Sequence, residues 1–310
     1  MTEKTLMDCV AVVVAPASTD FMSLGTHLEK AVSETSARPL GRVRLLGRDH
    51  RWSAVEVDVS LAEGQLKSAR TSLEKAFAGQ ADVALIPANG RRKRLLISDM
   101  DSTIIQQECL DELAAYAGLK DEIAAITAKA MAGELNFESA LIERVGKLEG
   151  LSLSALEQCY RERITIMPGA ATLTATMQAN GATCVLVSGG FTFFTSRVAD
   201  AVGFDAHQGN TLMNDGQELT GDVVQPILGR EAKLMALDKF ADEAGYSRSE
   251  TLAMGDGAND LAMIEAAGLG LAVHAKPIVA DSSDAGIQVT DLTAALYFQG
   301  YSDSEIVWRD

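Results

Sequence analysis

Residues 95–103 read Leu95-Leu96-Ile97-Ser98-Asp99-Met100-Asp101-Ser102-Thr103, an apolar run followed by two carboxylates one residue apart. The run is long enough for a buried strand, which would place Asp99 at its carboxyl end, where open α/β sheets bind ligands. In an extended strand Asp99 and Asp101 would point the same way, and adjacent carboxylates repel unless they share a cation or a proton. Ser102 and Thr103 add donors beside the acids. Taken alone, this stretch leaves open an Asp-rich turn that caps a helix at Ser102 or Thr103.

Three further segments carry groups suited to a phosphate and a hard cation. Ser188-Gly189-Gly190 follows a second apolar run, and its hydroxyl and accessible backbone amides suit an anion. Lys233 lies in a segment with helical character, 230–244, and is a point charge suited to phosphate. Gly255-Asp256-Gly257-Ala258-Asn259-Asp260 is an acidic loop after a third apolar run. Each segment has a structural alternative, a turn or a surface lysine, but together they indicate one site with oxygen ligands, which favour magnesium.

Composition restricts the classes of protein to consider. The chain has 310 residues, enough for about two domains, and 47% of them are hydrophobic, so a large core is expected. A net charge of −16 argues against nucleic acid or an anionic membrane as a partner, although it leaves a phosphorylated substrate open. We find no signal peptide and no apolar stretch of membrane-spanning length, so we expect a soluble, cytoplasmic protein. The scattered cysteines favour a reducing cytosol over a disulfide framework or a zinc site; they are Cys9, Cys109, Cys159 and Cys184.

The first ninety residues predict a small α+β unit. Strands are expected over 6–15, 42–46, 54–59 and 81–87, the middle two half-exposed, with helices over 21–35 and 61–78. This β-α-β-β-α-β order is the ferredoxin-like arrangement, and by element order alone it resembles the ACT family of regulatory domains. We therefore predict an ACT-like domain over 1–92. A dimerising or tethering module and an amino-acid sensor both stay open for it.

The remainder predicts a second domain over 93–310. Its boundary coincides with Arg91-Arg92-Lys93-Arg94, which would be either a solvated linker or a clamp between the domains. Alternating strands and helices predict a parallel sheet with helices on both faces. Four consecutive helical segments predict a cap over about 106–166, above the strand ends. The expected helices of the cap are 109–117, 121–131, 137–148 and 154–163; the expected strands are 183–187, 251–254, 269–273 and 286–289; further helices are expected after Met167-Pro168-Gly169 and over 191–202, and a hairpin around Asn214-Asp215-Gly216.

With these motifs in this order, residues 95 to about 290 resemble the haloacid dehalogenase superfamily. Within it the chain is most similar to the phosphoserine phosphatases, because Glu108 stands nine positions after Asp99 and residues 131–145 closely match that family's lid. The resemblance implies a Rossmann-like parallel sheet with helices on both faces, a helical-bundle cap inserted after the first strand, and an N-terminal ferredoxin-like domain. The N-terminal domain is where such proteins differ most.

The resemblance also implies roles for individual residues. Asp99 would attack phosphorus and form an aspartyl-phosphate, while Asp101 would act as general acid and base. Mg²⁺ would be held by Asp99, the backbone carbonyl of Asp101 and Asp256, with Asp260 orienting metal-bound water. The remaining residues would bind or shield the substrate: Ser188, Gly189, Lys233 and Asn259 at the phosphoryl group, with Gly190 beside them, Glu108 at its ammonium group, Arg144 at its carboxylate, and Met131 and Phe137 above it.

The implied reaction is magnesium-dependent hydrolysis of O-phosphoserine to serine and phosphate, the last step of serine biosynthesis. The partner would be this small molecule, with neither nucleic acid nor membrane, and a homodimer could form through residues 1–92. One alternative is a phosphomonoesterase acting on another small metabolite. A second is a regulatory protein in which Asp99 is phosphorylated but not turned over, and a third makes residues 1–90 a serine sensor.

Overall fold

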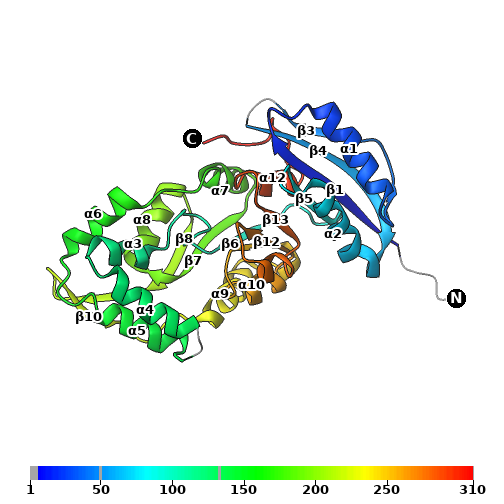
Figure 1. Ribbon diagram of the computed structural model, residues 1–310. Coiled ribbons are helices and arrows are strands. Elements are labelled where there is room, and N and C mark those ends of the chain that lie inside the picture. Colours follow the sequence, from blue (N-terminus) through cyan, green and yellow to red (C-terminus); the bar gives the residue numbers. More distant parts are fainter. Residues whose placement is uncertain (1–5, 49–50, 132–133, 310) are drawn as a thin grey trace.

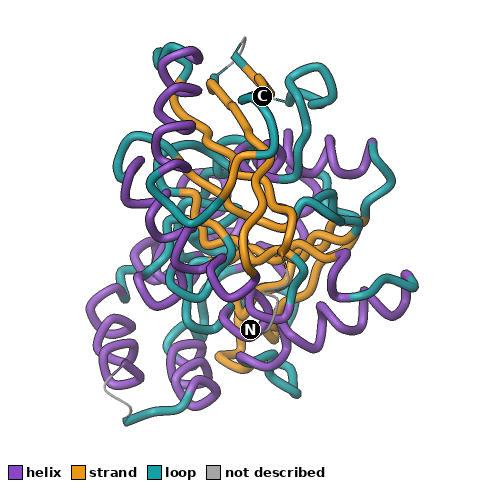
Figure 2. The backbone as a smooth tube through the Cα atoms, turned by 90° about the vertical axis from the view of Figure 1, so that its right-hand side faces the viewer, coloured by secondary structure: helices purple, strands orange, loops and turns teal. Residues whose placement is uncertain are grey.

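The computed structural model describes residues 6–48, 51–131 and 134–309, and one large sheet runs through the middle of these residues (Figures 1 and 2). Its strand order is β2-β4-β1-β5-β13-β12-β11-β6-β7-β8, and β3 also pairs with β4. The strands are β1 Leu6–Pro16, β2 Arg38–Pro39, β3 Arg44–Gly47, β4 Trp52–Ala62, β5 Asp82–Pro87, β6 Leu95–Ser98, β7 Thr183–Phe191, β8 Ala206–Asn210, β11 Thr251–Gly255, β12 Leu269–Val273 and β13 Ala285–Ile287, with a separate hairpin of β9 Leu212–Asn214 and β10 Leu219–Val223.

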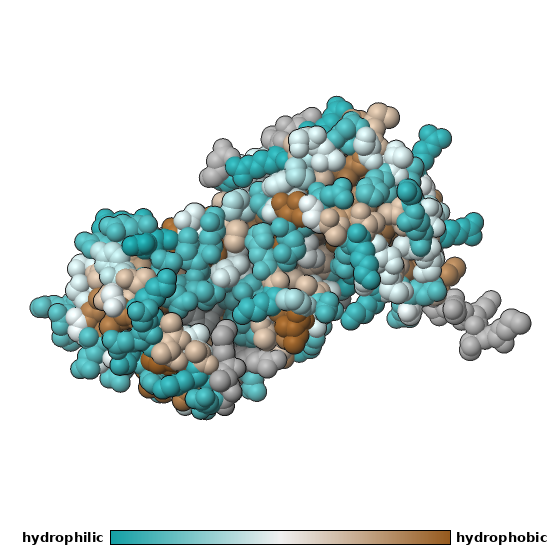
Figure 3. Space-filling model, in the orientation of Figure 1, coloured by the Kyte–Doolittle hydropathy of each residue, from teal (hydrophilic) through white to brown (hydrophobic). Residues whose placement is uncertain are grey.

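Helices cover both faces of this sheet. They are α1 Phe21–Ser33, α2 Leu66–Phe77, α3 Cys109–Tyr116, α4 Lys120–Met131, α5 Phe137–Gly146, α6 Leu153–Arg163, α7 Ala170–Ala179, α8 Thr192–Val202, α9 Arg230–Ala244, α10 Leu261–Ala266, α11 Pro277–Ala280 and α12 Ala294–Phe298. No helix among the described residues is long and apolar enough to cross a membrane. On the face drawn in Figure 3, apolar residues gather in small separate patches.

The N-terminal unit has the predicted ferredoxin-like arrangement. Its antiparallel strands lie in the order β3-β4-β1-β5, with α1 and α2 on one face. Residues 54–59, predicted to be half-exposed, are instead almost entirely buried within β4. The reason is a second cover, because the opposite face of this sheet packs against α12 near the C-terminus. Alternate residues of β1 show both covers, since Val13 faces the helices and Val12 faces the side of α12.

The second part of the sheet is parallel, as predicted, from β8 through β7, β6, β11 and β12 to β13. Helices α7 and α8 cover one face and α9 and α10 the other (Figure 1). Leu96 belongs to the first layer and Ile97 to the second, so the β6 strand is buried on both faces. The two parts join where β13 meets β5, at Ala285 opposite Ala84. The sheet is continuous at this junction, so it does not mark a boundary between two domains. The predicted domain boundary between residues 92 and 93 therefore stays a prediction.

Within the basic run, Arg91 connects the two parts, which is one of the two roles predicted for the run. Arg91 donates to the Glu56 carboxylate at 2.8 Å and to the Phe298 carbonyl at 3.1 Å. Lys93 is 8% exposed and donates to the Ser249 carbonyl at 2.8 Å. The flanking ion pairs are Arg92 with Glu305 and Arg94 with Glu250.

The cap lies at the far end of the molecule from the N-terminal unit (Figure 1). It consists of α3 to α6, as predicted, and the β9–β10 hairpin also packs against α5. An antiparallel bridge between Ile105 and Ile166 closes the base of this insertion.

Several elements differ from the sequence-based expectation, among them the helices α10 to α12, which were not predicted. β7 continues through Ser188-Gly189-Gly190 to Phe191 rather than ending at Val187. β8 was not predicted, because its sequence, Ala-His-Gln-Gly-Asn, is the polar sequence of a strand with a neighbour on one side only. α2 begins at Leu66, since β4 extends to Ala62 and a short 3-10 turn follows.

Candidate active site

The predicted site residues meet at the carboxyl ends of β6, β7 and β11, beneath the cap. A cavity of about 480 Å³ lies there, and ten of the predicted residues line it. These are Asp99, Asp101, Glu108, Phe137, Arg144, Ser188, Gly189, Gly190, Asp256 and Asn259. Lys233 and Asp260 lie behind the wall of the cavity, and the side chain of Met131 lies outside the described residues.

Asp99 is held rigidly at the end of β6. Its backbone N–H donates to the Met254 carbonyl at 3.0 Å, and its Oδ1 accepts from the Met100 N–H at 2.7 Å. Its Oδ2 lies 2.7 Å from Lys233 Nζ, which is also 2.6 Å from Asp260 Oδ1. Burial raises the pKa of Asp99 well above its usual value, against the opposing charge of Lys233. Burial would lower the pKa of Lys233, but Asp99 and Asp260 together raise it.

Three carboxylates converge where a cation was predicted. Asp99, Asp256 and Asp260 each offer an oxygen, and these atoms lie within 4.8 Å of one another. Burial, followed by the charge of Asp260, raises the pKa of Asp256 to about 6. A site made of carboxylate oxygens, with more negative charge than Lys233 alone can balance, fits a hard divalent cation such as Mg²⁺.

The loop that carries Asp256 and Asp260 depends on glycine. A Cβ on Gly255 would lie 2.4 Å from Asp260 Cγ, so no larger residue fits there. The Gly257 N–H donates to Asp260 Oδ2 at 3.0 Å, which fixes this carboxylate inside the loop. Gly255 is therefore required by close packing against a buried acid.

Asp101 is connected to the Ser188 turn by a chain of hydrogen bonds. Ser188 Oγ donates to Asp101 Oδ2 at 3.2 Å and accepts from the Gly190 N–H at 2.8 Å. Asp101 Oδ1 accepts from the Cys109 N–H at 2.9 Å, at the beginning of α3. Burial, followed by the charge of Glu108, raises the pKa of Asp101 to about 6, so the carboxyl can hold or release a proton near neutral pH.

Two residues of opposite charge face the cavity from the cap side. Glu108, immediately before α3, is exposed, and its Oε1 accepts from Ser102 Oγ at 2.7 Å. Arg144 on α5 donates through Nε to the Ala140 carbonyl at 3.1 Å, and among the described residues no hydrogen bond is made by its Nη1 or Nη2. Burial lowers the pKa of Arg144, opposed by nearby acids. The two outer nitrogens are thus available to a ligand carboxylate.

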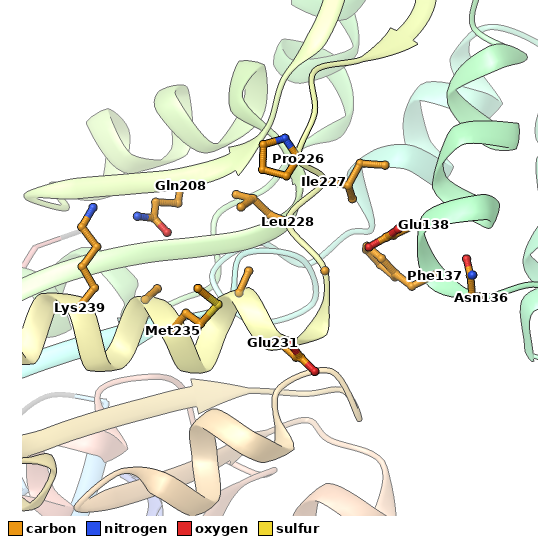
Figure 4. Close-up of a pocket in the computed structure, with 13 residues that line it drawn as sticks. Asn136, Phe137, Glu138, Gln208, Pro226, Ile227, Leu228, Glu231, Met235 and Lys239 are labelled. Atoms are coloured by element: carbon orange, nitrogen blue, oxygen red, sulfur yellow. The ribbon is translucent and has the colours of Figure 1, made fainter.

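Phe137 separates this cavity from a larger one. A Cβ on Gly189 would lie 3.2 Å from the Phe137 ring, so the ring rests on the Ser188 turn. The second cavity, about 760 Å³, lies between α9, residues 226–229 and the start of α5. In Figure 4, Phe137 stands at one end of it and Lys239 at the other, with Leu228 between them.

Sequence reasoning missed two charged residues in the lining of the active-site cavity, Asp111 and Lys276. Asp111 is in the first turn of α3. Lys276 follows β12, and its backbone N–H lies 3.3 Å from the Asp256 carbonyl. The position of Lys276 just beyond an expected strand, at the same edge of the sheet as Asp99, was the signal that could have identified it.

Comparison with known proteins agrees with this geometry. The family model of haloacid dehalogenase-like hydrolases matches residues 96–265. A probable phosphoserine phosphatase of Schizosaccharomyces pombe is 37% identical over 286 residues, which cover 89% of this chain and 96% of the relative. The chain belongs to the phosphoserine phosphatase family of haloacid dehalogenase-like hydrolases. A phosphoserine phosphatase of Streptomyces coelicolor is 41% identical over 83% of this hydrolase, which spans only 63% of that relative's length.

Solved structures share the fold of this hydrolase. A haloacid dehalogenase family hydrolase from Salmonella enterica serovar Typhi has a TM-score of 0.80 at 27% identity, covering 93% of this chain and 98% of that one. A probable phosphoserine phosphatase from Vibrio cholerae has a TM-score of 0.74 at 30% identity, covering 94% and 86%. A phospho-aspartyl intermediate analogue of phosphoserine phosphatase has a TM-score of 0.61 at 38% identity, covering 67% and 99%.

Proposed function

We propose that this hydrolase cleaves O-phosphoserine to serine and phosphate in a Mg²⁺-dependent reaction. The observation that carries the proposal is the pairing of two kinds of group in one cavity. Asp99 and Asp101 lie at its floor, suited to phosphoryl chemistry, while Glu108 and Arg144 line it with one negative and one positive charge. A phosphorylated α-amino acid presents a phosphate, an ammonium and a carboxylate, which complements this arrangement. The activities of the named relatives agree with it.

In the first chemical step an oxygen of Asp99 attacks phosphorus, and the bond from phosphorus to the serine oxygen breaks. Asp101 donates its proton to that departing oxygen, which leaves as the hydroxyl of serine. The raised pKa of Asp101 supports this role, because a carboxyl with a pKa of about 6 retains a useful protonated fraction near neutrality. The product is an aspartyl-phosphate on residue 99.

In the second step the ionised Asp101 removes a proton from water, which attacks phosphorus and releases Asp99 and phosphate. A regulatory protein with a long-lived phosphoaspartate would gain nothing from such a base, so turnover is the better interpretation. Mg²⁺ bound by Asp99 and Asp256, together with the Asp101 carbonyl, would stabilise negative charge on the transferring phosphoryl group. Asp260 would orient water bound at that ion.

The remaining residues of the cavity would bind the substrate. Ser188, Gly189 and Asn259 lie where phosphoryl oxygens would be held, and Lys233 contributes positive charge beside Asp99 at 2.7 Å. Phe137 rests against Gly189 and would exclude water when substrate is bound. Arg144 would receive the carboxylate in a bidentate contact and Glu108 the ammonium group. The phosphomonoesterase of different specificity remains the alternative, and these last two residues discriminate between them.

The test is phosphate release from O-phosphoserine with and without Mg²⁺, beside Asp99→Asn. We expect release only with the wild-type protein and the metal. Asn at position 99 keeps the size of the side chain and removes the nucleophile, so an active Asp99→Asn protein would reject the mechanism. Release from p-nitrophenyl phosphate without release from phosphoserine would support the alternative specificity.

The N-terminal unit has a proposed role that is separate from the chemistry. We propose that residues 1–92 dimerise or tether the enzyme, and a sensor of serine stays open. Sedimentation of the full chain with and without serine separates these roles. A monomer would contradict dimerisation, and a lack of any effect of serine on mass and activity would contradict a sensor.

A further inference from the structure

Asn210 is a buried amide that the reaction described above does not use. It is the last residue of β8, beside the Ser188 turn of β7, and 2% of it is exposed. Its Nδ2 donates to the Gly189 carbonyl at 2.8 Å and to the Leu228 carbonyl at 3.3 Å. Its Oδ1 accepts from the Leu228 N–H at 2.7 Å. Three bonds therefore connect one side chain to two separate backbone segments.

The bond to Gly189 determines which way a catalytically important peptide faces. The carbonyl of Gly189 and the N–H of Gly190 belong to one planar trans peptide, so they point in opposite directions. Because Asn210 holds the carbonyl on its side, the N–H is directed to Ser188 Oγ, 2.8 Å away. Ser188 Oγ in turn donates to Asp101. Two successive glycines resist rotation poorly, so this orientation needs an external constraint.

The bonds to Leu228 connect the same amide to the other side of the phosphate site. Leu228 lies two residues before the start of α9, and Lys233 is in the first turns of that helix. Asn210 thus spans the Ser188 turn and the segment that positions the lysine. In Figure 4, Leu228 lies next to the larger cavity, so this segment has open space on that side and a fixed anchor on the side of Asn210.

We propose that Asn210 is a positioning residue of the phosphoryl site. Its side chain fixes the orientation of the Gly189–Gly190 peptide relative to the helix that carries Lys233. Asn210 does not line the active-site cavity. It acts through Gly189 and Leu228, and the loss of its Nδ2 donor frees the peptide to rotate and breaks the chain from Gly190 through Ser188 to Asp101. The inference rests on the proposed phosphatase function.

The decisive variants are Asn210→Asp and Asn210→Ala. The first keeps the shape and the acceptor for the Leu228 N–H but loses the donor, and its carboxylate faces two carbonyl oxygens. We expect kcat/KM to fall on the order of 10²-fold, the size of loss that a displacement of about 1 Å produces. The loss should be equal for O-phosphoserine and p-nitrophenyl phosphate, and inhibition by inorganic phosphate should weaken, because the phosphoryl site is common to all three.

The matched control is Gln299→Glu, measured with rates normalised to folded protein. Gln299 is 1% exposed, accepts from the Lys93 N–H at 3.0 Å and donates to the Ala295 carbonyl at 3.0 Å, so it has the same pattern of bonds away from the site. We expect a lower Tm with wild-type kcat/KM for this variant. Asn210→Ser replaces Asn210→Ala if the latter does not fold.

Three outcomes would overturn the proposal. Asn210 variants with kcat/KM within about threefold of wild type would show that the peptide needs no such constraint. A loss confined to O-phosphoserine would place the effect in recognition of the amino acid. An equal loss of kcat/KM in Gln299→Glu would show that the Asn210 variants lose activity through general stability and not through the peptide. If the wild-type protein itself hydrolyses neither substrate, the proposed function fails, whereas an active wild type with active Asn210 variants rejects this inference alone.

Discussion

Arg144→Ala is the change that most sharply tests which substrate the cavity accepts. Arg144 reaches the cavity from α5, and its Nη1 and Nη2 make no hydrogen bond within the described residues. Its only hydrogen bond there is from Nε to the Ala140 carbonyl, on the same helix. Removing the side chain should therefore remove a contact to substrate while leaving the cap's own packing nearly intact.

The magnitude follows from the contact that would be lost. A hydrogen bond to a charged group contributes about 1.5–3 kcal/mol, and a bidentate pair adds geometric specificity. We take about 3 kcal/mol for the pair, which corresponds to a loss of about 150-fold in kcat/KM for O-phosphoserine. Because p-nitrophenyl phosphate has no carboxylate, its kcat/KM should change less than about threefold.

The assay is phosphate release from both substrates under identical Mg²⁺ concentrations, with Arg161→Ala as the control. Arg161 is an exposed residue of the cap helix α6, so this variant removes a cap arginine that does not line the cavity. We expect the control to resemble wild type with both substrates. Equal losses for both substrates in Arg144→Ala would refute the assignment of this arginine to a carboxylate.

Further predictions concern the proton, the metal and the junction between the two parts. Asp101→Asn should lower kcat/KM on O-phosphoserine by about 10²–10⁴-fold and on p-nitrophenyl phosphate far less, because kcat/KM reports formation of the aspartyl-phosphate, in which only the serine oxygen needs a proton to leave; equal losses in kcat/KM contradict the general-acid role. The pKa of Asp256 rises from 3.8 to about 6 on folding, so the folded state binds extra protons and the metal-free protein loses stability as pH rises through this window. Mg²⁺ should therefore raise the Tm more at pH 7.5 than at pH 5, as calorimetry can measure, and the reverse order contradicts a carboxylate metal site. Arg91→Ala removes one of the two arginine partners of the buried Glu56, the other being Arg44, and should cost about 1.5–3 kcal/mol in urea unfolding while phosphatase activity per folded molecule stays at wild type; a lower activity would contradict a purely structural junction.

Most of the fold could be predicted because the sequence patterns are local. Apolar runs ending in Asp99, Ser188 and Asp256 marked the strands whose carboxyl ends meet, and the structure brings all three into one cavity. The lid helices also followed from helical periodicity. What failed depended on tertiary contacts: β4 is buried on both faces because a C-terminal helix covers it, and β8 has a polar sequence at the edge of the sheet.

The site was predicted less completely than the fold, for a related reason. Asp99, Ser188 and Asp256 were found because each lies at or just beyond the end of an apolar run, whereas Glu108 and Arg144 were assigned from the family resemblance. Asn210 ends β8 and Lys276 follows β12, and only the folded chain reveals where these strands lie in the sheet. The role of Lys233 at the phosphoryl oxygens stays a prediction, and the structure adds a buried ion pair of Lys233 with Asp99 and Asp260 that the sequence did not indicate.

The most direct test of the central claim is a rapid acid quench of the enzyme during turnover of O-phosphoserine labelled on phosphorus, followed by mapping of the labelled peptide. The account predicts a phosphorylated enzyme whose label lies on Asp99, disappears when unlabelled substrate is added, and is absent from Asp99→Asn. Label on another residue, or rapid hydrolysis in the Asp99→Asn protein, would contradict it.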